Sequence, residues 1–118
     1  MPARLEDLAA SFRRDLRAEG RSERTGVVYG QSIRFFSAWL VAQGRPATLD
    51  ELERAAIRAW LADLSDRVEP GTVRTRYKGL RRFCRWLHAE GEIEVDPMAN
   101  MEIPKVSTSQ SRSSPTRT

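Results

Sequence analysis

The chain has 118 residues, enough for one folded domain with a modest hydrophobic core but too few for that core plus a large catalytic cleft. Its 20 lysines and arginines outnumber its 16 aspartates and glutamates, giving a net charge of +4 that favours a polyanionic partner only where the cations cluster. One cysteine and one histidine exclude an intrachain disulfide framework and a cysteine-based zinc site.

Apolar residues at helical spacing predict a first helix from about Ala3 to Glu19, which packs on its neighbours and ends at Gly20. A second helix is predicted from Ser22, whose hydroxyl suits an N-cap, to about Gln43. Its inward face has Tyr29, Ile33, Phe36 and Leu40, and its opposite face has Arg24, Val27, Val28, Gln31, Arg34 and Phe35. Valines on that second face indicate either ordinary surface hydrophobes or contact with the first helix, or else apolar contact with thymine methyls or sugars of DNA.

The third helix is predicted from about Glu53 to Arg67, after a loop and a short turn capped by Thr48. Its inward residues are Ile57, Trp60, Leu61 and Leu64, and its outward residues are Arg54, Arg58, Asp63 and Asp66. Because the outward charges have both signs, this helix is interpreted as part of the scaffold.

The fourth helix is expected to begin at Pro70, with Glu69 or Thr72 as its cap, and to end before Gly91. Its core stripe is Val73, Tyr77, Leu80, Cys84 and Leu87. Within this stripe Cys84 is expected to be a small buried hydrophobe and not a reactive thiol. Arg76 falls at the flank of the stripe, where it could pair with an acidic residue of another helix.

A second stripe on the fourth helix is cationic. Its members, rotated by about 100° from the core stripe, are Arg74, Lys78, Arg81 and Arg85, extended by Thr75 and Arg82. No Asp or Glu occurs between Pro70 and Ala89. Exposed helix faces normally mix signs to form i,i+4 pairs, so an unmixed cationic stripe predicts nucleic-acid binding.

The C-terminal part changes character after Gly91. A short turn or helix is expected from Pro97 to Met101, and the Ser/Thr-rich segment from Ser107 onward is expected to be disordered. The expected organisation is a helical domain at 1–106 followed by a linker or tail at 107–118.

Several kinds of chemistry have no motif in this sequence. There is no Gly-rich phosphate loop, no His/Cys spacing for a metal and no nucleophile with a matching base, so no cofactor, no metal and no complete enzyme are expected. No apolar run approaches the roughly 20 residues of a transmembrane helix, and the N-terminus has acids where a signal peptide is apolar. We expect a soluble cytoplasmic protein with no membrane partner.

The order and spacing of these segments resemble the core-binding domain of tyrosine recombinases, the phage-integrase class. The resemblance covers roughly Leu5 to Lys105. The segments that carry it are SERTGVVYGQSIRFFSAWL at 22–40, TLDEL at 48–52, IRAWLADL at 57–64, TVRTRYKGLRRFCRWL at 72–87, EGEIEVDPMA at 90–99 and PK at 104–105.

The resemblance implies an all-α, SAM-like bundle of four main helices that forms half of a C-shaped clamp around duplex DNA. Its second and fourth helices would approach the major groove, and a linker near the PK pair would lead to a separate catalytic domain. The residues carried over as DNA contacts are Arg24, Thr25, Val28, Gln31, Arg74, Thr75, Lys78, Arg82 and Lys105. The helical periodicity of the second and fourth helices adds Arg34, Arg81 and Arg85 to these predicted DNA contacts.

The resemblance also implies which partners the chain has and that it lacks the catalytic residues of the family. The partners would be duplex DNA, the catalytic domain of a full-length parent and other recombinase protomers on DNA, in the cytoplasm and at the nucleoid of a bacterium or phage host. The family's chemistry needs a nucleophilic tyrosine on the catalytic domain, whereas Tyr29 and Tyr77 lie on core stripes here. We therefore expect binding without cleavage.

Two alternatives remain open at this level. A helical protein-interaction module would use Trp39, Phe35 and the exposed valines as its contact patch. The other is a standalone transcription-factor-like DNA binder. A compact helix-turn-helix repressor is disfavoured, because the loop at 44–48 is longer than the usual turn of 3–4 residues.

Overall fold

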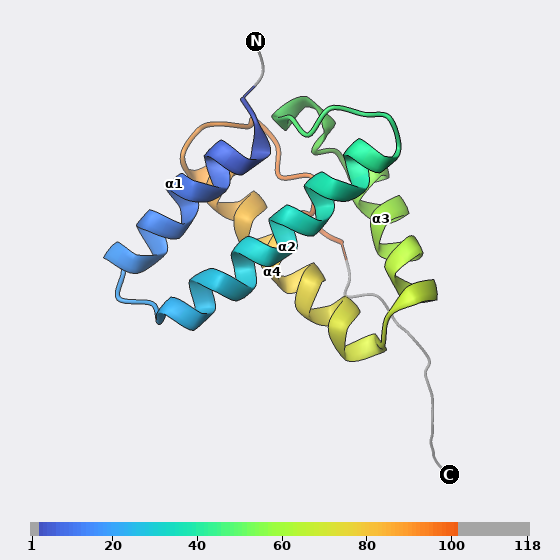
Figure 1. The fold of residues 1–118 in the computed structure, drawn as a ribbon. Coiled ribbons are helices and arrows are strands. Elements are labelled where there is room, and N and C mark those ends of the chain that lie inside the picture. The colour runs from blue at the N-terminus through green and yellow to red at the C-terminus, as the bar shows by residue number, and fades with distance from the viewer. Residues whose placement is uncertain (1–2, 102–118) are drawn as a thin grey trace.

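The computed structural model describes residues 3–101, and in them the chain forms four α-helices (Figure 1). These are α1 (Leu5–Ala18), α2 (Glu23–Ala42), α3 (Arg54–Arg67) and α4 (Pro70–Ala89), with a short 3-10 helix η1 (Leu49–Glu51) between α2 and α3. The described residues contain no strand, only an isolated antiparallel bridge between Arg4 and Thr48. The prediction of an all-α bundle of four main helices is confirmed. No described helix has both the length and the apolarity to span a membrane.

The helix ends follow the predicted local signals with two exceptions. The Ser22 hydroxyl accepts a hydrogen bond from the Thr25 backbone N–H at 3.1 Å, and Pro70 occupies the first turn of α4. Glu69 holds the N-cap position of α4, but its side chain makes no capping bond. Thr48 likewise precedes η1 without capping it, and its hydroxyl is buried with no partner in the described structure. Glycines with positive φ follow α1, α2 and α4, as expected of helix C-termini: Gly20, Gly44 and Gly91.

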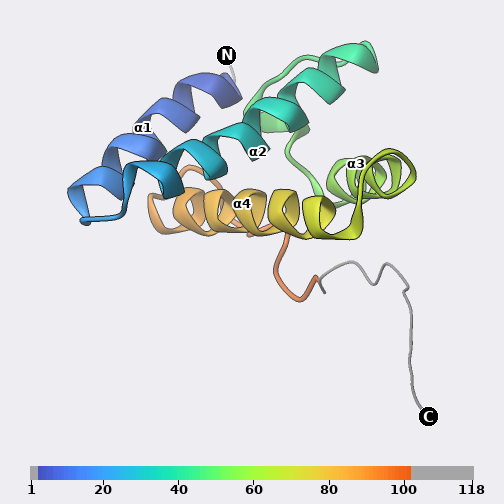
Figure 2. The ribbon, with the colours of Figure 1, turned by 60° about the horizontal axis from the view of Figure 1, so that its bottom comes forward.

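The helices form two layers that meet where α2 crosses α4. In Figures 1 and 2, α1 lies beside α2 in one layer, and α4 runs beneath α2 with α3 next to it. At the crossing, a Cβ added to Gly79 would lie 2.7 Å from the Ser32 Cβ and 3.4 Å from the Tyr29 Cα. Real Cβ atoms do not approach so closely, so glycine at position 79 is what permits this crossing.

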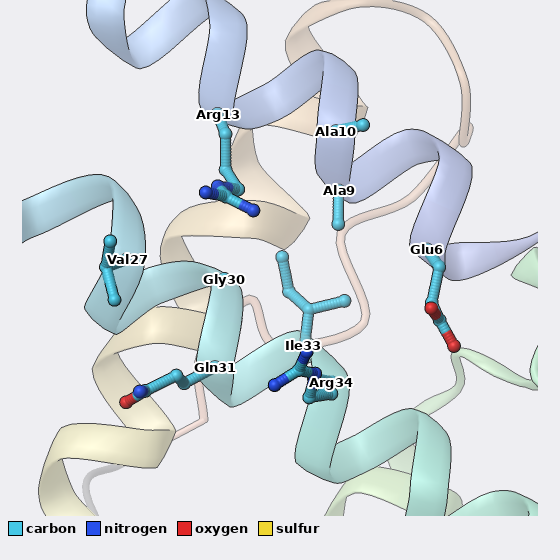
Figure 3. Close-up of a pocket in the computed structure, with 9 residues that line it drawn as sticks. All are labelled: Glu6, Ala9, Ala10, Arg13, Val27, Gly30, Gln31, Ile33 and Arg34. Carbon is cyan, nitrogen blue, oxygen red and sulfur yellow. The ribbon is translucent and has the colours of Figure 1, made fainter. Parts of the chain in front are cut away.

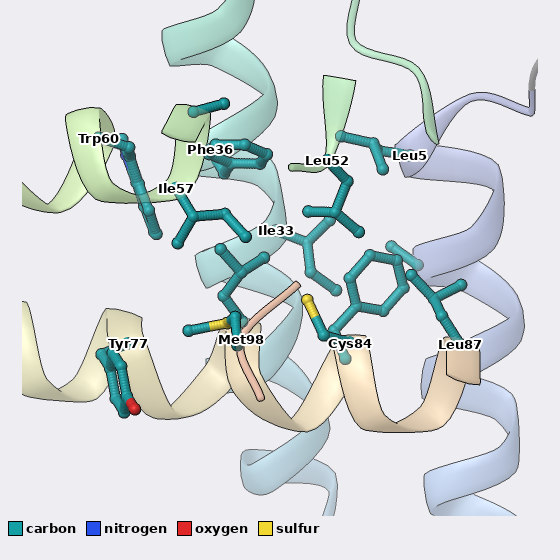
Figure 4. Packing of buried hydrophobic residues seen from close by; sticks show 14 of the residues in the cluster. Leu5, Ile33, Phe36, Leu52, Ile57, Trp60, Tyr77, Cys84, Leu87 and Met98 are labelled. Atoms are coloured by element: carbon teal, nitrogen blue, oxygen red, sulfur yellow. The ribbon is translucent and has the colours of Figure 1, made fainter. Parts of the chain in front are cut away.

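The core is assembled from every helix (Figure 4). The predicted core stripe of α4 is buried throughout, and Phe83 joins it. Aromatic contacts connect the layers, with Phe12 of α1 against Phe83 at 5.5 Å and Phe36 of α2 against Trp60 of α3 at 5.3 Å between ring centroids. Burying side chains of this size stabilises the fold by roughly 1.5–3 kcal/mol each before entropy is counted.

The segment after α4 closes the core. Met98 is fully buried and Met101 nearly so, in a turn where the Asp96 carboxylate accepts a hydrogen bond from the Met98 N–H at 2.9 Å. The Tyr77 hydroxyl donates to the Met101 carbonyl at 2.6 Å. The turn was predicted, but its two methionines were not recognised as core residues.

Candidate nucleic-acid interface

The crossing of α2 and α4 places the N-terminal halves of both helices on one side of the molecule. In Figure 1 these halves diverge below the crossing, whereas η1 lies on the other side. Val28 and Thr75 each lie four residues, about one turn, before the crossing contact of Ser32 with Gly79. The two halves therefore offer neighbouring outward surfaces.

We define the outer face of α2 and α4 by the predicted contact residues of these two halves. Its members are Arg24, Thr25, Val28, Gln31, Arg74, Thr75 and Lys78. Thr25 and Val28 are half-buried and the other five are exposed. Two of the predicted contact residues have local hydrogen bonds: the Thr25 hydroxyl lies 2.9 Å from that of Ser22, and the Thr75 hydroxyl donates to the Gly71 carbonyl at 3.0 Å. The Thr75 oxygen keeps its capacity to accept a hydrogen bond from a ligand.

Acidic residues are segregated away from this face. Neither α4 nor α2 from Arg24 onward contains Asp or Glu, whereas α1 and α3 mix both signs. Glu23 and Glu69 lie at the helix starts, where a negative charge suits the helix dipole. Because like charges on one helix repel each other, the arrangement becomes favourable when a polyanion neutralises it.

Arg81 has a structural role that the helical wheel did not reveal. It is half-buried, and its Nη1 donates to the Tyr77 hydroxyl at 3.0 Å and to the carbonyls of Met101 and Met98 at 3.1 and 3.3 Å. The Arg81 guanidinium therefore holds the segment after Gly91 against α4. The α4 pattern could not show this, because the acceptors are backbone carbonyls far along the chain.

Arg82 and Arg85 lie in the C-terminal half of α4, beside α1. They line a groove together with Glu19 and Trp86. Arg82 is half-buried and lies 3.8 Å from the Glu19 carboxylate, an exposed ion pair of small net stability. Arg85 is exposed. Trp86 donates from Nε1 to the Asp15 carboxylate at 2.8 Å and so joins α4 to α1, a link that sequence reasoning missed.

Arg76 does not pair with an acid in the described structure. Its guanidinium carbon lies 4.3 Å from the centroid of the Phe35 ring, a cation–π contact between α4 and α2. Partial burial lowers the pKa of Arg76 from its ordinary value. The expectation of an acidic partner is therefore corrected: an aromatic face takes that place.

The remaining predicted residues are spread more widely. Arg34 is exposed, but it faces a groove between α1 and α2 that also includes Arg13 and Gly30. Lys105 and the predicted linker or tail at 107–118 lie outside the described residues. The structure thus places the predicted residues of the N-terminal halves of α2 and α4 on one side of the crossing, puts Arg34 in a groove that also includes Gln31, and gives Arg81 another role.

Cys84 is buried, as predicted. Burial raises the pKa of its thiol, and the negative charge of Asp96 raises it further, so the thiol stays neutral near pH 7. Residues 3–101 contain no cluster of three or more His, Cys, Asp or Glu side chains that could hold a metal ion.

Comparison with known proteins gives a match over most of the folded region. Residues 8–91 match the family model described as phage integrase, N-terminal SAM-like domain. Tyrosine recombinase XerD of Lacticaseibacillus casei is 35% identical over 102 residues, which cover 86% of this chain and 34% of that protein. Tyrosine recombinase XerC of Mycobacterium leprae is 31% identical over 90 residues, which cover 73% of this chain and 29% of that protein.

A third relative, tyrosine recombinase XerD of Shewanella oneidensis, is 36% identical over 94 residues, which cover 76% of this chain and 30% of that protein. The chain therefore spans about a third of the length of these curated relatives. No solved structure matches the chain at a significant level.

Proposed function

The chain belongs to the family of phage integrase N-terminal SAM-like domains, found in tyrosine recombinases, and from this premise we propose that it binds duplex DNA as one half of a clamp. The outer face of α2 and α4 would approach the major groove, which α2 would enter. The observation that carries this proposal is the cationic surface of two crossing helices with no acidic residue between Arg24 and Ala42 or in α4.

The binding mechanism combines neutralisation of phosphates with a few contacts in the groove. Arg24, Arg74 and Lys78 are exposed and free to reach phosphates, which supply most of the affinity of such interfaces. Gln31 can form a bidentate hydrogen bond with adenine, and Val28 offers methyl groups to a thymine methyl. Thr25 and Thr75 retain acceptor capacity but have local partners, so their role in base recognition is secondary.

This domain would contribute binding and not chemistry. Tyr77 is buried and its hydroxyl is bonded to the Met101 carbonyl, while Tyr29 is half-buried against the Phe12 ring, so neither is placed as a nucleophile. In a full-length parent, a catalytic domain would close the clamp from the other side of the duplex, and further protomers would bind beside it. That role is compatible with a cytoplasmic, nucleoid-associated location.

Fluorescence anisotropy with labelled duplex DNA at several salt concentrations tests the proposal. Binding at low salt should weaken steeply as salt increases, because phosphate neutralisation releases counterions. A duplex that shows no binding even at low salt would overturn it. Lys78→Ala is the informative variant, since Lys78 is exposed and makes no ion pair within the described residues.

One observation favours a second candidate, a helical protein-interaction module. A groove of about 560 Å³ lies between α2, α3 and α4, and its lining includes Phe35, Trp39, Val68 and Arg76. Amide chemical-shift mapping separates the two functions. Duplex DNA should perturb the outer face of α2 and α4, whereas a protein partner should perturb the lining of this groove and tolerate high salt.

A further inference from the structure

A second cationic feature lies outside the outer face, in the groove between α1 and α2 (Figure 3). The groove has a volume of about 330 Å³, and small residues on both helices leave it open: Ala9, Ala10 and Gly30. Arg13 of α1 and Arg34 of α2 flank it, and Gln31 lies at its edge. The opening can admit a phosphate group and part of the attached sugar.

The position of Arg13 depends on Gly30. A Cβ at position 30 would lie 3.1 Å from the Arg13 Cδ, which is tighter than most Cβ contacts, and 3.6 Å from its Nε, which is an ordinary contact. Glycine here lets the arginine lie across the surface of α2. The charged end of an α1 residue is thereby held over α2, in a groove whose lining also includes Gln31 and Arg34.

Neither arginine is neutralised within the described structure. Arg45, Arg67 and Arg82 lie within 4 Å of carboxylates, but Arg13 and Arg34 make no ion pair or hydrogen bond there. The positions three and four residues away on their own helices hold no acid. Glu6 also lines the groove, but seven residues before Arg13, about 10 Å along the helix axis.

The groove lies on the side of α2 opposite to α4. Gly30 contacts α1 and Ser32 contacts α4, and two residues correspond to about 200° around a helix. A helix about 10–12 Å wide fills a major groove about 12 Å wide, so a phosphate strand runs along each side of it. With α2 in the groove, one strand would face α4 and the other would face Arg13 and Arg34.

We propose that Arg13 and Arg34 bind a backbone phosphate of the duplex strand that runs along the α1 side of α2, with Gln31 between this contact and the bases. The proposal rests on the proposed function, since it requires α2 to enter the major groove. It adds α1 to the DNA-contacting elements and gives Gly30 a role in placing Arg13.

The test compares charge-neutralising variants that remove the same charge from neighbouring sites. Arg13→Gln and Arg34→Gln are each expected to weaken duplex binding about threefold to tenfold at roughly 0.1 M salt and to lower the salt slope by about 1. Arg14→Gln is the matched control, because Arg14 is exposed on α1 but does not line the groove. Circular dichroism melting of each variant shows whether the fold is kept.

The outcomes separate this inference from the proposed function. Suppose that Lys78→Ala weakens duplex binding, but Arg13→Gln and Arg34→Gln bind the duplex as tightly as Arg14→Gln does. That result would overturn the inference and leave the proposed function standing. Absence of any duplex binding by the wild-type domain would overturn both. If Arg13→Gln unfolds the domain, Arg34→Gln decides alone, since Arg34 is exposed and lies on the opposite wall.

Discussion

Lys78 and Arg81 lie one turn apart on the same cationic stripe of α4, yet their surroundings differ. Lys78 is exposed, with no ion pair in the described structure, so its charge is available to a ligand. Arg81 is half-buried and donates to Tyr77, Met98 and Met101. Two cations on the same stripe therefore differ: the Lys78 side chain is exposed and unpaired within the described residues, whereas the Arg81 side chain holds the segment after Gly91 against α4.

The first prediction follows from this difference. Lys78→Ala should weaken duplex binding and lower the salt slope by about 1, with a nearly unchanged melting temperature. Arg81→Ala should instead cost about 1–3 kcal/mol of folding stability, because two buried carbonyls lose a charged donor. Chemical denaturation and anisotropy on both variants check this. A stable Arg81→Ala variant would contradict the structural role.

A second residue-scale prediction concerns Cys84. Its thiol has a raised pKa in the folded state, whereas an unfolded cysteine ionises near pH 8.5. The folded state therefore binds more protons above that pH, and the free energy of unfolding should decrease by up to about 1.4 kcal/mol per pH unit. Urea unfolding at pH 7 to 10 measures the slope. Cys84→Ala, which cannot ionise, should lack this contribution, and an equal slope in both proteins would refute it.

At the scale of elements, the crossing of α2 and α4 determines which residues share the outer face. Both helices would form as separate amphipathic helices from their local signals, but their contact depends on one pair of small residues, Ser32 and Gly79. The Ser32 hydroxyl is buried with no hydrogen-bond partner among the described residues, so what Ser32 contributes to this contact is its small size.

Gly79→Ala should therefore destabilise the domain, although helix propensity alone favours alanine by about 1 kcal/mol. Its new Cβ would lie 2.7 Å from the Ser32 Cβ and push the helices apart. Gly71→Ala is the control, because nothing lies within 4 Å of the added atom. Thermal melting should show a lower melting temperature for Gly79→Ala and no decrease for Gly71→Ala. Ser32→Gly combined with Gly79→Ala should restore part of the stability, and equal melting temperatures of the two single variants would contradict the packing argument.

At the scale of the whole molecule, charge distribution matters more than net charge. A net charge of +4 is modest, but no acid occurs in α4 or in α2 from Arg24 onward, and the acids lie at the helix starts, on the other helices and outside the helices. If about five phosphates are contacted, the log–log salt slope of duplex binding should be about −4 to −6. Titration between low and moderate salt measures it. A slope near zero would show that binding does not depend on phosphate neutralisation.

The sequence alone determined the helices, because the apolar repeat of each helix, the Ser22 cap of α2 and the glycines after α1, α2 and α4 act within a few residues. The sequence also determined most of the core and the cationic stripe, because the face on which a helical residue lies depends only on the fixed pitch of the helix. It also missed Met98 and Met101, because burial of a turn depends on what the turn docks against.

Tertiary structure decided which cations are free and which helices share a face. Arg81 bonds carbonyls of the segment after α4, Arg76 lies over Phe35 of α2, and Arg13 lies across Gly30. Each of these contacts joins residues that are distant in the chain, through atoms with no signature in the spacing of either helix. Helical periodicity is a local property that indicates in which direction a side chain points. Which residue that side chain contacts depends on how the helices cross. Here the crossing of α2 and α4 requires glycine at position 79.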